Sequence, residues 1–340
     1  MTHYFKVDAE AQKLLDMIYA PMYTQILFAA IELDVFSEME EAKTHEEVAE
    51  RLNLHPENTR RLLDALTGMD LLEKEKGFYK NARSASRYLV LGSELYLGDH
   101  LRVYNIGSDF EGADLVKLVK EGPDSENKNK KGLEACSVFG DFAEMLKSQQ
   151  RGGRAKEITD LVSALPEFAG FKKILDLGGC PGLIGMAVVR KHPDMRGIVF
   201  DTPDMGTVAR ELIKENEMGD RMEVMSGDYL KDFIGEGYDC VLAIGTLNFA
   251  KHDMDGIIKK IYEALNPGGV FISISEGLTH EETKPKEMVA AWLPSFLRGF
   301  DFSLKQGEIS DASLRNGFRS VYKQTVNMLT GPMDVDIAKK

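Results

Sequence analysis

Tryptophan and cysteine are the scarcest residues of this 340-residue chain, which has one Trp and three Cys. Cys136, Cys180 and Cys240 lie far apart, so they suggest neither a metal site nor a disulfide framework. No run of 18 or more apolar residues is present, and the N-terminal stretch lacks the basic-then-apolar layout of a signal peptide. We therefore expect a cytoplasmic protein with reduced cysteines, no metal and no membrane-spanning segment.

Positive charge is also in short supply. The 42 Lys and Arg residues are outnumbered by 55 Asp and Glu residues, which gives a formal net charge of −13 at pH 7. A basic surface is what attracts nucleic acids and anionic membranes, so this balance argues against both as partners. The 43% of apolar residues is enough for an ordinary packed core. The remaining partners are small molecules and other protein subunits.

The N-terminal third has helical patterns followed by a hairpin. Apolar residues recur at helical spacing over residues 11–36. Thr44 and Glu47 form a capping box that opens a second helix, and Pro56 opens a third. A hairpin is predicted to turn at residues 76–77, a Lys-Gly pair. This order of helix, turn, helix and hairpin is typical of a winged helix.

A winged helix raises the possibility of DNA binding. The helix that would read DNA carries Arg60 and Arg61 but also Glu57 and Asp64, and the surrounding sequence is acidic. Residues 21–36 are apolar on more than one helical face, which a monomer cannot easily cover. A packing or dimerisation role is therefore favoured over DNA binding.

Strands alternate with helices from Lys172 onward, which predicts an α/β fold with a doubly wound, largely parallel sheet. A charged segment with almost no apolar residue, 120–132, separates this part from the helical third. We expect a helical winged-helix domain over 1–120, a linker with connecting helices over 121–170, and the sheet domain over 171–340. Ligands of such sheets bind at the carboxyl ends of the strands.

A glycine cluster follows the first strand of the sheet domain, in the stretch Asp176-Leu-Gly-Gly-Cys-Pro-Gly182. Gly178, Gly179 and Gly182 allow the backbone to approach a ligand closely, and Gly182 stands where a helix begins. The spacing departs from G-x-G-x-x-G, and no Gly-Lys-Ser/Thr follows, which excludes a phosphate loop of the ATPase type. An acidic residue, Asp176, precedes the glycines.

Two further carboxylates end or follow the next strands. Asp201 is placed to accept hydrogen bonds from ribose hydroxyls, and Asp228 follows the third strand. Three carboxylates are unfavourable beside a pyrophosphate, but they suit a cationic sulfonium that carries an ammonium group. The alternative is that all three are ordinary solvent-facing caps.

These motifs, LDLGGCPG, VFDTP, SGDYL and ALNPGG, resemble the ordered motifs of class I S-adenosylmethionine-dependent methyltransferases. With its helical first third, nearly the whole chain resembles the dimeric small-molecule O-methyltransferases, which include plant caffeate and bacterial polyketide or phenazine enzymes. The resemblance implies a Rossmann-like sheet behind a winged-helix dimerisation domain, S-adenosylmethionine as cofactor and a homodimer. It places the methionine part against Gly178, Gly179 and Gly182, the ribose at Asp201, and the adenine beside Asp228 and Tyr229.

The family's catalytic histidine is missing. Counting along the stretch YDCVLAIGTLNFAKHD places Asn248 at its position, and an asparagine cannot act as a base. His252, four residues further on, is an alternative if the loop is shifted. Glu276 and Glu308 match the acidic residues that flank this histidine in plant enzymes; each is a candidate base or substrate ligand, or a plain cap. His100 is a weaker candidate.

The resemblance also predicts a cavity for the acceptor. Helical spacing of its candidate lining residues fits a plain core equally well. We expect methyl transfer to a small aromatic or heterocyclic acceptor, with N-, S- or C-methylation open beside O-methylation because the histidine is lost. The alternatives are a protein that binds the cofactor without methyl transfer and a winged-helix regulator. The candidate lining residues are Tyr104, Phe142, Met145, Trp292 and Phe296.

Overall fold

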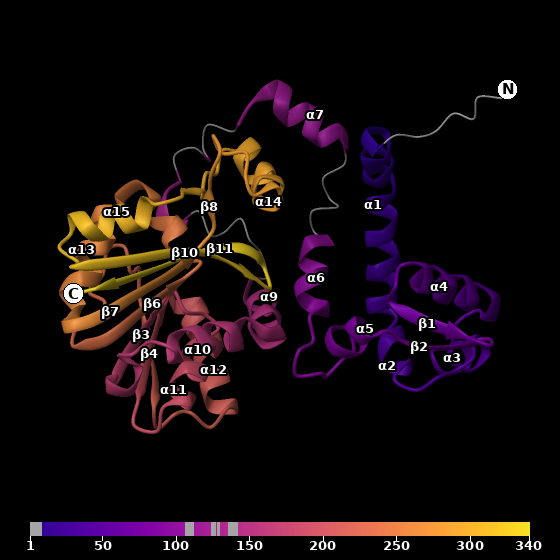
Figure 1. Cartoon of the computed structure of the whole chain (residues 1–340), viewed down its shortest axis with the longest axis horizontal. Coiled ribbons are helices and arrows are strands. Elements are labelled where there is room, and N and C mark those ends of the chain that lie inside the picture. The colour runs from indigo at the N-terminus through magenta and orange to yellow at the C-terminus, as the bar shows by residue number, and fades with distance from the viewer. Residues whose placement is uncertain (1–8, 106–111, 124–126, 128–129, 135–141) are drawn as a thin grey trace. The chain divides into compact units, whose positions relative to one another are not determined.

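The computed structural model describes residues 9–105, 112–123, 127, 130–134 and 142–340. The chain forms two compact units, residues 1–107 and 108–340 (Figure 1). Each unit has an apolar core of its own.

The first unit follows the predicted order of helices and hairpin. Thr44 accepts a hydrogen bond from the Glu47 backbone and the Glu47 side chain accepts one from the Thr44 backbone, so the predicted capping box is confirmed. The hairpin turns at Lys76 and Gly77, both with positive φ. The elements are α1 (Ala9–Glu32), α2 (Val35–Glu38), α3 (His45–Arg51), α4 (Pro56–Gly68), β1 (Leu72–Glu75), β2 (Phe78–Asn81), α5 (Arg83–Tyr88) and α6 (Gly98–Asn105).

Helix α1 leaves much of its apolar surface uncovered within the first unit. Met17, Ile18 and Met22 are each more than 60% exposed. Residues Ala11–Glu32 are long and apolar enough to cross a membrane by length and composition, although they also contain Pro21. A helix that pairs with another protein surface has the same length and apolar composition.

The second unit is built around one seven-stranded sheet in the order β10-β11-β7-β6-β3-β4-β5. The five strands from β7 to β5 are parallel to one another, as the alternating pattern predicts. A C-terminal antiparallel hairpin, β10 and β11, extends the sheet beyond β7. The strands are β3 (Lys173–Leu177), β4 (Arg196–Asp201), β5 (Met222–Ser226), β6 (Tyr238–Ile244), β7 (Leu265–Ser275), β10 (Ser320–Met328) and β11 (Gly331–Lys339), with a separate pair, β8 (Gly277–Leu278) and β9 (Leu304–Lys305).

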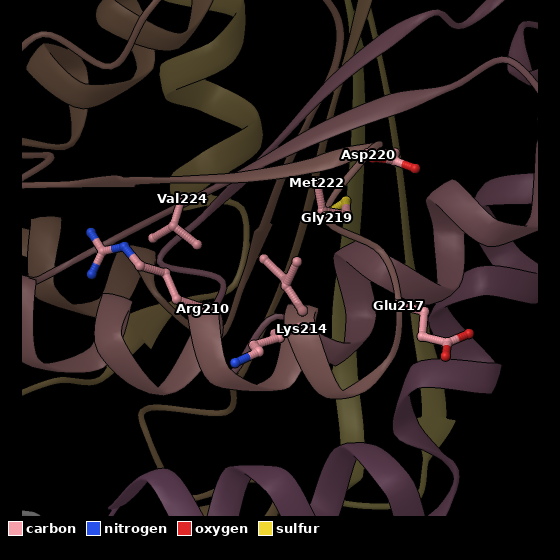
Figure 2. A pocket seen from close by; sticks show the side chains of 8 residues that line it. Arg210, Lys214, Glu217, Gly219, Asp220, Met222 and Val224 are labelled. Atoms are coloured by element: carbon pink, nitrogen blue, oxygen red, sulfur yellow. The ribbon is translucent and has the colours of Figure 1, made fainter.

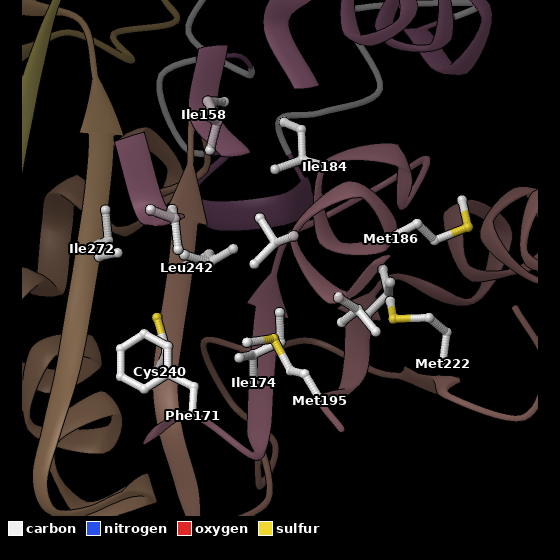
Figure 3. Packing of buried hydrophobic residues seen from close by; sticks show 14 of the residues in the cluster. Ile158, Phe171, Ile174, Ile184, Met186, Met195, Met222, Cys240, Leu242 and Ile272 are labelled. Atoms are coloured by element: carbon white, nitrogen blue, oxygen red, sulfur yellow. The ribbon is translucent and has the colours of Figure 1, made fainter. Parts of the chain in front are cut away.

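Helices cover both faces of this sheet. Helices α10, α11 and α12 pack on one face, where Ile158 and Ile184 meet Ile174, Leu242 and Ile272 (Figure 3). Helices α13 and α15 pack on the other face. The helical elements are α7 (Gly112–Glu121), α9 (Phe142–Gln149), the π-helical η3 (Gln150–Arg154), α10 (Ala155–Ser163), η4 (Phe168–Gly170), α11 (Leu183–Lys191), α12 (Pro203–Glu215), η5 (Leu247–Asp253), α13 (Met254–Ala264), α14 (Lys286–Arg298) and α15 (Glu308–Arg315).

Candidate functional site

The glycine loop leaves β3 and enters α11 at the carboxyl edge of the sheet. Gly178 and Gly182 have φ of 61° and 91°, which a residue with a side chain rarely adopts. A Cβ on Gly178 would lie 2.0 Å from the Thr246 hydroxyl oxygen, and one on Gly179 would lie 2.3 Å from the Asp176 carboxyl carbon. The glycines are therefore needed both for the turn and for the close approach of the loop to its neighbours.

Asp176 lies beneath this loop, in β3, and is only 1% exposed. Its Oδ2 accepts a hydrogen bond from the Gly185 backbone at 3.0 Å. Its Oδ1 is buried and has no hydrogen-bond partner within the described residues. Burial, with a further contribution from nearby Asp201, raises the pKa of Asp176 to about 7 against the opposing effect of the Gly185 N–H. The side chain thus presents an unsatisfied acceptor toward which a cation would be drawn.

Asp201 ends β4 and is 8% exposed. Its two carboxylate oxygens accept hydrogen bonds from the backbone N–H groups of Cys180, at 3.0 Å, and Thr202, at 2.8 Å. Burial raises the pKa of Asp201, while both N–H groups lower it. Each oxygen keeps a lone pair for a further donor, so this carboxylate can hold the glycine loop and a diol together.

The stretch after β5 forms a tight turn. Asp228 Oδ1 accepts the Leu230 N–H at 3.0 Å, and its carboxylate pairs with Lys231 at 3.0 Å. Tyr229 is buried, its ring meets Phe200 edge to face, and its hydroxyl donates to the Thr246 carbonyl at 3.0 Å. The Tyr229 ring is therefore a core side chain, and Asp228 is the polar group that the turn presents.

Two residues that sequence patterns did not identify tie these motifs together. Thr246, just after β6, contacts both the Gly178 position and the Tyr229 hydroxyl. Gln150 is buried in η3; its amide group donates to the Cys180 carbonyl at 3.2 Å, and its carbonyl accepts the Ile184 N–H at 3.3 Å. The position of Thr246 just after a strand could have identified it as a site residue, because ligands bind at the carboxyl ends of the strands. No local pattern marks Gln150, which is 26 residues before Asp176.

Asn248 lies in η5 and is 4% exposed. Its Nδ2 donates to the Phe302 carbonyl at 2.7 Å, whereas its Oδ1 has no hydrogen-bond partner in the described parts of the chain. Asn248 and Phe302 line a cavity of about 180 Å³ together with aromatic and charged residues. The other lining residues are Lys130, Lys131, Gly132, Phe249, His252, Gly299, Phe300 and Asp301.

The other candidate catalytic residues have different surroundings. Glu276 directly follows β7 and is half-buried. Glu308 is the first residue of α15, and its carboxylate accepts a hydrogen bond from the Lys305 N–H of β9 at 3.0 Å. His100 is buried in α6 of the first unit. The structure thus binds the Glu308 carboxylate to the backbone of β9 and places Glu276 at the carboxyl edge of the sheet.

The predicted lining residues are spread over α6, α9 and α14. Trp292 packs against Phe302 with ring centroids 5.8 Å apart, within a small cluster that includes Phe249 and Phe300. Met145 and Phe296 are half-buried. The side chains of Tyr104 and Phe142 lie outside the described residues. Trp292 is therefore the lining candidate that the structure brings next to the neighbourhood of Asn248.

A larger cavity, of about 460 Å³, lies between α12 and the edge strand β5 (Figure 2). Its walls carry charges of both signs, and none of the predicted site residues is among them. Across the described residues, no group of three or more His, Cys, Asp or Glu side chains is placed to hold a metal ion. The lining residues are Arg210, Ile213, Lys214, Glu217, Gly219, Asp220, Met222 and Val224.

Comparison with known proteins covers both units. An O-methyltransferase domain model matches residues 141–297, and an O-methyltransferase dimerisation domain model matches residues 15–91. The N,N-dimethyltransferase OxyT of Streptomyces rimosus is 25% identical over 332 residues, 95% of each chain. The tetracenomycin polyketide synthesis 8-O-methyl transferase TcmO of Streptomyces glaucescens is 26% identical over 76% of each chain. Human N-acetylserotonin methyltransferase, solved with S-adenosylmethionine, has the same fold, with a TM-score of 0.78 at 22% identity over 99% of both chains.

Proposed function

The chain belongs to the O-methyltransferase family and carries that family's dimerisation domain, and from this premise we propose that it methylates a small aromatic acceptor whose nucleophile needs no protein base. The chain is a methyltransferase, and its cofactor is S-adenosylmethionine. The acceptor and the atom that receives the methyl group are the proposed part. The observation that carries the proposal is the buried Asn248 at the position of the family's histidine.

The residues at the carboxyl edge of the sheet fit this cofactor. The loop at Gly178 and Gly179 has no room for side chains, so a ligand meets backbone there. The unsatisfied Oδ1 of Asp176 suits the cationic methionine portion, and the Asp201 carboxylate suits the ribose diol. When bound, the cofactor supplies a methyl group that is already activated by the sulfonium.

Asn248 serves as an anchor of its loop in this proposal. Its amide nitrogen is committed to the Phe302 carbonyl, which fixes the side chain and leaves the amide oxygen as a hydrogen-bond acceptor. A carboxamide cannot take up a proton at neutral pH. Alignment of nucleophile, methyl group and sulfur then has to supply most of the acceleration. The acceptor must therefore arrive with a lone pair that is already free.

Two acceptor classes meet this condition: an acidic phenol, ionised at neutral pH, and an unprotonated amine. The family favours oxygen. The similarity to OxyT, an N,N-dimethyltransferase, is the specific observation that supports nitrogen as the second candidate. The cluster of Phe249, Trp292, Phe300 and Phe302 beside Asn248 supports an aromatic acceptor in either case.

A panel of acceptors tests the proposal. Phenols and aromatic amines of graded pKa would be incubated with the protein and S-adenosylmethionine, and S-adenosylhomocysteine would be quantified. The rate should follow the ionised or unprotonated fraction of the acceptor. The rate could also show a second pH dependence that does not match the pKa of any acceptor. If this dependence disappears in Glu276→Gln, Glu276 is the base. Binding of the cofactor with no turnover on any acceptor would favour a cofactor-binding protein instead.

We also propose that the protein is a cytoplasmic homodimer without a nucleic-acid or membrane partner. The exposed apolar face of α1 lies within the segment that the dimerisation domain model matches, and the net charge of −13 opposes anionic partners. Sedimentation equilibrium should give twice the chain mass. Retardation of random duplex DNA at low salt, lost on raising the salt, would instead support the regulator hypothesis.

A further inference from the structure

We infer that Lys260 is a positioning residue for the adenine side of the cofactor site, because its ammonium group gathers three backbone carbonyls of the turn that presents Asp228. The inference rests on the proposed function, which places adenine against this turn. Lys260 belongs to α13, and the resemblance assigned it no role.

The contacts of Lys260 account for the whole donor capacity of its ammonium group. Its Nζ donates to the carbonyl oxygens of Tyr229 at 2.9 Å, Leu230 at 3.1 Å and Asp232 at 2.9 Å. An ammonium group has three N–H bonds, so each one is used on this single turn. The side chain is half-buried, and burial lowers the pKa of Lys260 while Asp228, Asp232 and Asp253 raise it.

The turn depends on this cation because its carbonyls converge. The backbone of residues 228–232 also folds on itself: the Asp232 N–H bonds to the Asp228 carbonyl at 2.7 Å, and the Asp228 N–H bonds to the Asp232 carboxylate at 2.8 Å. These bonds turn the three carbonyls toward α13, where Lys260 satisfies them. Without the ammonium group these carbonyls would face one another beside α13 with no donor from its side chain at position 260, which is unfavourable for partly buried acceptors.

Lys260 therefore affects the cofactor site by fixing the position of Asp228. Tyr229 anchors the same turn from the other side through its hydroxyl bond to Thr246. Asp228 directly precedes Tyr229, the residue that both anchors hold. If the carbonyls separate, the carboxylate moves away from the adenine while the glycine loop and Asp201 stay in place.

The neighbouring residue provides a matched control. Lys259 is exposed, and its ion pair within the described residues is a 4.0 Å contact with Glu263 on its own helix. Lys259→Met and Lys260→Met remove the same charge one position apart on α13. Only the second removes the contacts to the turn.

Calorimetric titration with S-adenosylhomocysteine and with adenosine tests the inference. Lys260→Met should weaken both ligands by about tenfold, whereas Lys259→Met should leave both within about twofold of wild type. The equal loss for adenosine is the informative result, because adenosine lacks the methionine portion. With saturating S-adenosylmethionine, kcat and the KM of the acceptor should stay close to the wild-type values, while the KM of S-adenosylmethionine rises.

Each outcome has a distinct meaning. Unchanged adenosine affinity in Lys260→Met, with wild type binding normally, would overturn the inference and leave the proposed function intact. Failure of the wild-type protein to bind either ligand would refute the proposed function itself. If Lys260→Met does not fold, as judged by circular dichroism, Lys260→Arg takes its place. The planar fork of arginine keeps the charge but cannot point three donors at three converging carbonyls, so an intermediate loss is expected and an unchanged affinity would overturn the inference.

Discussion

Replacing Asp176 by asparagine should stabilise the cofactor-free protein at alkaline pH and weaken cofactor binding. Asp176 is buried, and its Oδ1 has no hydrogen-bond partner among the residues that the structure describes. Asparagine has nearly the same shape, and its carbonyl can still accept the Gly185 N–H that now bonds to Oδ2. The substitution therefore removes the ionisation while it keeps the packing.

The magnitude follows from the shift of the pKa. Asp176 has a pKa of about 7 in the folded protein and 3.8 as its reference value. The folded chain binds the proton more tightly, so the stability associated with this group is complete below the reference pKa and falls as pH rises toward the folded pKa. At ~1.4 kcal/mol per pH unit, the loss reaches ~2 kcal/mol at pH 5 and ~4 kcal/mol at pH 8. The asparagine side chain does not titrate, so the stability of the Asp176→Asn variant relative to wild type should rise by about 2 to 3 kcal/mol between these pH values.

Urea unfolding of the cofactor-free protein at pH 5 and pH 8 measures this difference. The new amide group of the variant has no evident acceptor, which costs about 1 to 3 kcal/mol at every pH. The test is therefore how the difference in free energy of unfolding between variant and wild type changes from pH 5 to pH 8, and not its value at one pH. Titration with S-adenosylmethionine at pH 8 should show at least about tenfold weaker binding by the variant, because the carboxylate that faces the cationic ligand is gone.

Equal pH dependence of unfolding in wild type and variant would refute the argument that burial raises the Asp176 pKa. Unchanged affinity for S-adenosylmethionine would refute the role of Asp176 as the acceptor for its cationic portion. A variant that is more stable at pH 8 yet binds the cofactor as well as wild type would mean that the unsatisfied oxygen serves another ligand.

Three further predictions concern the same edge of the sheet. Asp201→Ala should weaken S-adenosylmethionine binding by about tenfold or more in calorimetry, and an unchanged affinity would refute the ribose assignment. Gly178→Ala places a Cβ against Thr246, so thermal unfolding should show a loss of about 1 to 3 kcal/mol together with weaker cofactor binding; wild-type behaviour would show that the loop has room. Gln150→Leu removes one hydrogen bond to the loop and one to the first turn of α11, and should raise the KM of S-adenosylmethionine several-fold, whereas a change in kcat alone would contradict a role in loop positioning.

Several features of the fold depend on neighbours in sequence and were therefore predictable. The capping box of Thr44 and Glu47 and the turn at Lys76 and Gly77 involve residues three or fewer positions apart. The alternation of strands and helices after Lys172 predicted the parallel part of the sheet. Because the carboxyl ends of parallel strands lie at one edge, it also predicted that Asp201 and Asp228 lie at that edge. The antiparallel pair β10 and β11 was not predicted from this alternation, because no helix separates the two strands.

The sequence by itself determined the family, the cofactor and the order of the motifs, since these follow from local patterns and from the direction of parallel strands. Only the tertiary structure decided which distant side chains hold each motif in place. Gln150 beneath the glycine loop, Thr246 between two motifs, and Lys260 under the turn at Asp228 each contact residues at least 17 positions away in the sequence. The pKa of Asp176 likewise depends on which distant groups exclude water from it. The hydrogen bond of the Asn248 amide depends on the distant Phe302 carbonyl that accepts it. Such relations arise from packing, which leaves no periodic mark in the chain.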